Sequence, residues 1–275
     1  MPEKVVPGPV KDTAGIREAV CIHTNKIFDS CRDKDCIEDL RFYPTQNAQN
    51  VIDRALSVKA GNAELLYTYI DVEPVGFNRG FFTVDVRYFY RVFADAFVGG
   101  GRPVRICGLC IFDKRVVLFG SEGAAKIFRS TPYSEEHDEH TAVHSNLPCA
   151  VVEAVDPMVL NMKLVDVCEC GGVAEPAEVP AGIACCFDGP LSFANEGRRI
   201  YVTLGQFSLI RLERESQLMI PSYDYCIPEK ECSCGGEDDP CEIFRAVTFP
   251  TEEFFPPNTV AVGDTYRGAQ NFCGA

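Results

Sequence analysis

The segment from Arg79 to Asp95 alternates clearly between two sets of side chains. One set points one way and consists of Phe82, Val84, Val86, Tyr88, Tyr90 and Val92. Thr83, Asp85, Arg87, Phe89 and Arg91 point the other way. Because successive side chains of a strand point to opposite faces, this pattern predicts a long amphipathic β-strand. Gly99-Gly100-Gly101 then turns the chain into two short strand-like segments, 104–110 and 115–119, which together form a meander.

Further segments are rich in β-forming residues. Residues 65–72 read as a strand that stops at Pro74, and residues 150–167 and 199–212 also favour strands. The apolar spacing of residues 47–60 is mixed and fits either a helix or a strand. The predicted fold is therefore mainly β, with two packed β-rich halves arranged like a sandwich and few short helices.

The domain organisation follows from Pro, Gly and charge clusters. We expect an N-terminal arm at 1–20, a β-rich domain at 21–130, an acidic His-containing loop or linker at 131–148, and a cysteine-rich β domain with a C-terminal tail at 149–275. Cys110-Ile-Phe-Asp-Lys114 is echoed by Cys226-Ile-Pro-Glu-Lys230, which leaves open a duplicated β unit.

Composition narrows the class of protein. The 275 residues include 26 Lys and Arg against 40 Asp and Glu, a formal net charge of −14. Nucleic-acid binding rests on cationic side chains that neutralise phosphates, so this charge argues against a nucleic-acid partner. The apolar stretches are too short to cross a bilayer, and no membrane span is expected. With 46% hydrophobic residues the chain has enough apolar material for a folded core.

The chain contains 15 cysteines, an unusually high number. The first ten residues lack the pattern of an export signal, and we expect a protein made and kept inside a cell. Cytosolic thiols usually stay reduced, so this content indicates metal sites, redox chemistry or a product that is oxidised later. Because the number of cysteines is odd, at least one of them cannot pair within its own chain, which permits a disulfide to a neighbouring copy. The disulfide or cross-link candidates are Cys21, Cys31, Cys36, Cys107, Cys110, Cys149, Cys168, Cys170, Cys185, Cys186, Cys226, Cys232, Cys234, Cys241 and Cys273.

Cys107-Gly-Leu-Cys110 has the spacing that serves zinc or dithiol exchange. A redox motif of this kind opens a helix, whereas β-forming residues lie on both sides here. No second CxxC completes a zinc ribbon. Buried or cross-linking thiols on strands are the favoured interpretation.

His137, His140 and His144 lie among acidic residues and would share one face of a helix, where they could bind a divalent ion. The bounding prolines and the missing apolar stripe favour a solvated loop instead. A zinc- or iron-binding protein that uses this loop and the clustered cysteines is the alternative function. No catalytic signature occurs, so we expect neither an enzyme nor a cofactor, although an uncharacterised enzyme stays a third interpretation.

Residues 20–41, with Cys21, Cys31 and Cys36, and residues 69–86 resemble the cysteine-rich exosporium or spore-coat proteins of spore-forming anaerobes of the clostridial type. This resemblance implies a structural protein of the spore surface, made in the mother-cell cytoplasm without a signal peptide. It further implies self-assembly into a disulfide-cross-linked two-dimensional lattice. The implied partners are copies of the same chain, in a hexameric ring that tiles into sheets, and other spore-coat proteins.

Overall fold

A computed structural model describes residues 20–123, 125–127, 144–166, 179–193, 197–220, 244 and 247–254. Strands dominate this part of the chain, and the mainly β prediction is confirmed. The elements are β1 (Val20–Pro44), α1 (Gln46–Ile52), β2 (Ser57–Pro74), β3 (Phe81–Phe97), β4 (Val104–Phe119), β5 (Lys126–Ile127), β6 (His144–Ser145), β7 (Cys149–Ala154), β8 (Met158–Asp166), α2 (Ala181–Ala184), β9 (Arg198–Ile220) and α4 (Thr251–Phe254).

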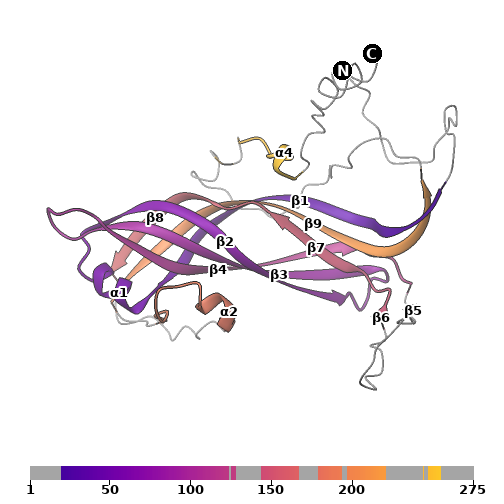
Figure 1. Cartoon of the computed structure of the whole chain (residues 1–275), viewed down its shortest axis with the longest axis horizontal. Coiled ribbons are helices and arrows are strands. Elements are labelled where there is room, and N and C mark those ends of the chain that lie inside the picture. The colour runs from indigo at the N-terminus through magenta and orange to yellow at the C-terminus, as the bar shows by residue number, and fades with distance from the viewer. Residues whose placement is uncertain are drawn as a thin grey trace, which may run out of the picture.

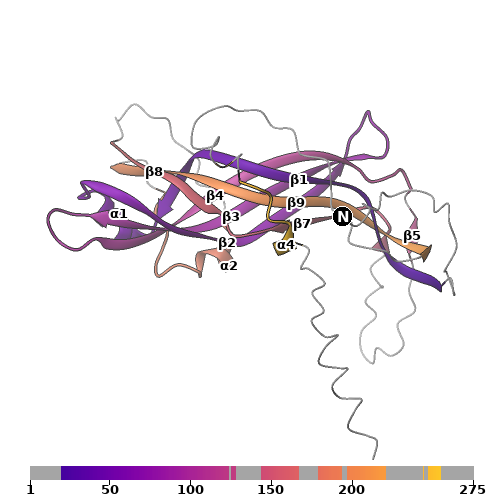
Figure 2. The same ribbon diagram turned by 90° about the horizontal axis from the view of Figure 1, so that it is seen from above.

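The long strands form two layers that face each other (Figures 1 and 2). One layer has the antiparallel order β2-β3-β4. In the other, β1 pairs with one edge of β9, while β7 and β8 follow each other along the opposite edge. The two layers resemble a sandwich, but they belong to one seven-stranded sheet. Since β1 comes from the first half of the chain, residues on both sides of 131–148 share one layer.

The two layers are joined at a corner where β1 meets β4. Only Tyr43 with Leu109 and Pro44 with Gly108 are paired between these strands. A Cβ atom at Gly108 would lie 2.6 Å from both the Phe42 ring and the Tyr43 carbonyl oxygen, so the corner requires a glycine.

The open edges of the two layers also approach each other. The Leu65 backbone N–H on β2 donates to Asp156 Oδ1 at 2.9 Å, in the turn between β7 and β8. This contact brings the free edge of β2 towards the β7–β8 edge. The sheet is therefore nearly closed.

The main core lies between the layers. It includes Val84 and Tyr88 of β3 together with Leu204 and Ile210 of β9, all fully buried. A second, smaller core lies on the outer face of the β2-β3-β4 layer, where the segment of α2 covers β3 and β4; its buried members are Phe89, Leu109, Ile183 and Phe187. The centre of β3 is consequently buried on both faces.

β4 is one continuous strand, whereas the sequence predicts two short strands in this region. The polar stretch between them stays in the ladder because its side chains have partners. Asp113 and Arg115 face outward and form ion pairs with Arg87 and Asp85, which lie directly opposite on β3. Lys114 points inward and is buried.

The observed elements differ most from the predicted ones at the start of the described chain. β1 is a 25-residue strand for which the sequence pattern alone makes no prediction. Residues 47–60, which fit either a helix or a strand, contain both: α1 occupies the first part, and β2 begins at Ser57. The Thr45 side chain caps α1 by accepting a hydrogen bond from the Ala48 N–H. Of the predicted arm at 1–20, residues 1–19 lie outside the described residues, and Val20 begins β1.

Candidate functional site

The cysteines within the described residues fall into a bonded and a free group. Cys31 and Cys36, both on β1, are disulfide-bonded. The free cysteines are Cys21, Cys107, Cys110, Cys149, Cys185 and Cys186. The other cross-link candidates lie outside the described residues: Cys168, Cys170, Cys226, Cys232, Cys234, Cys241 and Cys273.

Cys31 and Cys36 are not bonded to each other. Five strand positions separate their Cα atoms by about 16 Å, whereas the Cα atoms of a disulfide lie within about 7 Å. A disulfide between these two neighbouring cysteines is therefore excluded. Each of them bonds to a different cysteine.

The CxxC pair on β4 is split between the two faces of the sheet. Cys110 is fully buried in the core between the layers, while Cys107 packs against the outer core under α2. An offset of three residues places strand side chains on opposite faces, so these sulfurs cannot meet at one metal ion. Burial raises the pKa of both thiols, which disfavours their thiolate forms. Both act as packing side chains in this fold.

Three free thiols are exposed, at well-separated places: Cys21, Cys149 and Cys185. Cys21 lies opposite Met219 near one end of the β1–β9 ladder. Cys149 pairs with Glu213 on the other edge of β9, about 20 Å away along the strand. Cys185 ends α2 on the outer face of the opposite layer. Within one copy these three thiols are too far apart to bond with one another.

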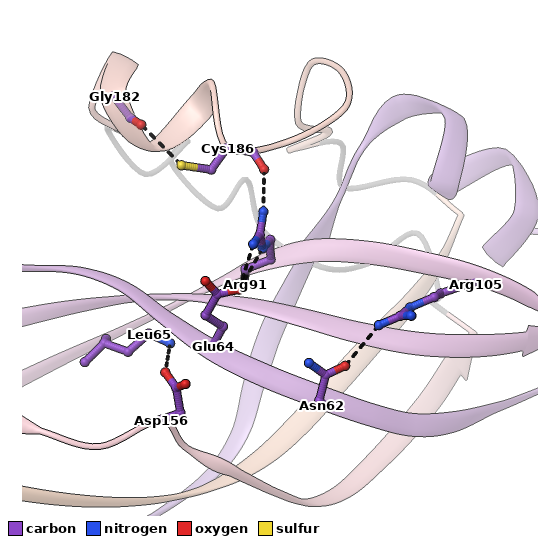
Figure 3. A network of polar contacts seen from close by, with 8 residues as sticks. All are labelled: Asn62, Glu64, Leu65, Arg91, Arg105, Asp156, Gly182 and Cys186. Carbon is purple, nitrogen blue, oxygen red and sulfur yellow. Dashed lines mark hydrogen bonds and ion pairs between the residues drawn. The ribbon is translucent and has the colours of Figure 1, made fainter.

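The loop that carries Cys185 and Cys186 is anchored to the sheet by Arg91 of β3 (Figure 3). The Arg91 guanidinium donates to Glu64 Oε2 on β2 at 2.7 and 3.2 Å. A further nitrogen, Nη1, donates to the Cys186 carbonyl oxygen at 3.0 Å. The Cys185 and Cys186 thiols both donate to the Gly182 carbonyl oxygen, at 3.0 and 3.5 Å. The exposed Cys185 thiol is therefore presented on an anchored turn.

A cluster of charged side chains lies between β1 and β4, inside the protein. Lys114 Nζ forms ion pairs with Asp33 Oδ2 and with Asp35, whose two oxygens both lie 2.7 Å away. The side chains of Lys114, Asp33 and Asp35 are only 4%, 5% and 12% exposed. Three ionisable groups are thus enclosed where water is scarce.

The surroundings of this cluster are aromatic and apolar. Tyr88 and Tyr90 of β3 stack with ring centroids 6.0 Å apart, and the negative charge of Asp35 acts on both of them. Burial raises the pKa of Asp35 from 3.8 to about 7. Asp35 is therefore about half protonated at neutral pH.

The sequence contains a signal for this cluster, in the inward positions of β4. These alternate residues are Ile106, Gly108, Cys110, Phe112, Lys114, Val116 and Leu118. Lys114 is the charged residue in this otherwise apolar series. Continuing the strand period through residue 114 would have predicted a buried lysine that needs a carboxylate partner.

The acidic loop at 131–148, for which metal binding is the alternative interpretation, lies mostly outside the described residues. His137 and His140 lie outside the described residues, and the backbone of His144 pairs with Ile127 between β6 and β5. Within the described part of the chain, no group of three His, Cys, Asp or Glu could hold a metal ion. No helix described there is long and apolar enough to span a membrane.

Comparison with known proteins finds similarity to an exosporium protein. The chain is 24% identical over 253 residues to exosporium protein A of Clostridium sporogenes (strain ATCC 15579), an alignment that covers 87% of this chain and 74% of the relative. No protein-family model matches, and no solved structure matches. The relative supports the resemblance to exosporium proteins that residues 20–41 and 69–86 indicate.

Proposed function

We propose that this chain is a structural protein of the outer layer of a bacterial spore, where copies of it assemble into an ordered, disulfide-cross-linked array. The observation that carries the proposal is the similarity to exosporium protein A over most of both chains. A structural role also suits the mainly β fold, whose CxxC pair serves packing.

The exposed thiols support the cross-linking part of the proposal. Cys21, Cys149 and Cys185 are free, exposed and unable to pair with one another within one copy. When copies lie side by side, such thiols can bond across the boundary once their β-carbons come within about 4.5 Å. In the reducing mother cell they would stay as thiols, and oxidation after assembly would lock the array.

Noncovalent contacts must bring the copies together first. The outer face of the β2-β3-β4 layer exposes the apolar side chains Tyr67, Tyr69, Val117 and Phe119. A specific interface buries at least about 1,000 Å² in all, and exposed aromatic side chains suit its centre. The proposal also includes a hexameric ring, the tiling of rings into sheets, and contacts with other spore-coat proteins. These parts rest on the resemblance alone.

Electron microscopy and electrophoresis test this function. The purified protein should form sheets or tubes, and oxidised material should survive near-boiling detergent as covalent multimers. Adding a thiol reductant under the same conditions should release monomer. A strictly monomeric sedimentation profile at micromolar concentration would contradict assembly. Equal heat resistance with and without reductant would contradict the role of the cysteines.

A further inference from the structure

We propose that Lys114 and Asp33 condense into an intramolecular amide, an isopeptide bond between β4 and β1, with Asp35 as the acid–base group of the reaction. This modification site concerns the single chain. It therefore stands whether or not the protein forms spore-surface arrays.

The geometry places a nucleophile against an acyl carbon. Lys114 Nζ contacts Asp33 Oδ2 directly, and all three side chains of the cluster are held by strands that enclose them. Fixing two reactants in contact removes the entropic cost of their encounter. The same burial excludes the bulk water that would favour the separated ions.

Leaving the cluster as ions is costly. If all three groups were ionised, two negative charges and one positive charge would share a site that is nearly closed to solvent. Burying charges costs several kcal/mol per ion, and attraction within the site does not always offset it. An amide between Lys114 and Asp33 removes two of these charges. It leaves Asp35, whose pKa burial raises to about 7, so that this group can both give and take a proton around neutral pH.

The two oxygens of Asp33 have different environments. Oδ1 accepts a hydrogen bond from the Lys34 backbone N–H at 2.7 Å. That donor would stabilise the negative charge that develops on this oxygen when the carbonyl carbon becomes tetrahedral. Oδ2 contacts Lys114 Nζ and is the oxygen positioned to leave.

The reaction balances without any oxidant or other reagent. Lys114 first gives a proton to Asp33, so that a neutral amine meets a neutral carboxylic acid. The nitrogen lone pair then attacks Asp33 Cγ, and Asp35, 2.7 Å from Nζ, takes a proton from the nitrogen and returns one to the leaving oxygen. The new C–N bond forms as the Cγ–Oδ2 bond breaks. One water molecule is released, and Asp35 is regenerated.

The proposed bond lies where the backbone ladder is missing. β1 and β4 pair only at Tyr43–Leu109 and Pro44–Gly108, so the rest of the two strands is not joined by a backbone ladder. Side chains bridge the gap instead: Asp29 Oδ2 accepts from the Phe119 backbone N–H at 3.1 Å, and Lys114 meets the two inward carboxylates of β1. An isopeptide bond would close this gap covalently.

Mass spectrometry of the full chain tests the proposal. After reduction and alkylation of all cysteines, the unfolded protein should be lighter by one water molecule than the mass expected for its alkylated sequence. Trypsin cannot cleave after an acylated lysine, so the digest should contain residues 106–115 joined to the β1 peptide that holds Asp33. A chain of full sequence mass that is cleaved normally after Lys114 would overturn the proposal.

Variants and an internal control sharpen this test. The exposed pair of Lys163 and Asp39, with Nζ 2.9 Å from Oδ1, should stay unlinked and be cleaved normally after Lys163. Lys114→Arg should keep the full mass, because a guanidinium stays protonated and cannot attack. Asp35→Asn, which preserves shape but cannot shuttle a proton, should slow or abolish the loss of water. If Asp35→Asn loses water as fast as the wild type, the role of Asp35 is wrong.

Discussion

Arg87 on β3 forms a bidentate ion pair with Asp113 on β4: Nε lies 2.6 Å from Oδ1, and Nη2 lies 3.0 Å from Oδ2. The neighbouring pair, Asp85 and Arg115, repeats this geometry with the charges exchanged between the strands. These outward pairs flank the strand position of Lys114. They keep a polar stretch of β4 in the ladder while its lysine is buried.

Removing the exposed pair should have a small effect. Asp113→Ala is expected to lower the free energy of unfolding by less than about 1 kcal/mol, because exposed ion pairs gain little in water and are screened by salt. Urea unfolding at low and high salt measures this effect. Asp71→Ala is the matched control: Asp71 lies opposite Asp85 across the β2–β3 pair, so its removal should be neutral or slightly stabilising. A loss of several kcal/mol for Asp113→Ala would contradict this account.

The corner between the layers should tolerate no side chain at Gly108. Gly108→Ala would force a Cβ atom to within 2.6 Å of the Phe42 ring and the Tyr43 carbonyl oxygen. Overpacking of this kind costs about 1–3 kcal/mol, and circular dichroism during urea unfolding should show the loss. Gly101→Ala, where nothing lies within 4 Å of the added atom, should change the urea midpoint little. Equal midpoints for the two variants would show that the corner relaxes.

The contribution of Asp35 to the free energy of unfolding should fall as the pH rises from about 4 to about 7. The pKa of Asp35 is 3.8 in the unfolded reference and about 7 in the folded chain, so between these values the folded state binds more protons than the unfolded state. The stabilisation from Asp35 is therefore complete below about pH 4 and is lost as the pH approaches 7. Asp35→Asn should flatten this dependence, measured as the urea midpoint at pH 4, 5.5 and 7. Parallel curves for variant and wild type would contradict the assignment.

The exposed thiols should carry a large share of the bonds between copies. Replacing Cys21, Cys149 and Cys185 together by Ser should reduce the covalent multimers seen in non-reducing detergent gels, while the assemblies still appear by electron microscopy. Cys110→Ala is the control, because its buried thiol cannot reach another copy. Undiminished multimers in the triple variant would assign the cross-links to other cysteines.

The sequence predicts those strands whose two faces differ clearly. β3 could be predicted from the sequence because its inward side chains are apolar throughout, from Phe82 to Val92. β1 was not, because its inward face carries Asp33 and Asp35, and register shifts after Ile27 and Ile37 interrupt the alternation. Charged side chains that satisfy one another inside the protein invert the pattern on which strand prediction rests.

The cysteine sites were predictable as residues but not as an arrangement. The predicted strand at 104–110 contains Cys107 and Cys110 and places them on opposite faces, but it does not show which core each face meets. The sequence also cannot separate the bonded Cys31 and Cys36 from the exposed Cys21. Those distinctions arise from tertiary packing and from the long pairing of β1 with β9, which joins residues far apart in the chain.

Because the two layers are joined at a single corner between β1 and β4, the resistance of the fold to mechanical tension should depend on the direction of pulling. Tension along the strands would load the β1–β9 ladder in shear, so many hydrogen bonds would have to break together. Tension across the layers would act on the two residue pairs at Tyr43–Leu109 and Pro44–Gly108 one after the other, as in opening a zipper. A coat built from such subunits would resist tension along the strands and would yield to tension across the layers. A covalent bond between β1 and β4 would remove this difference.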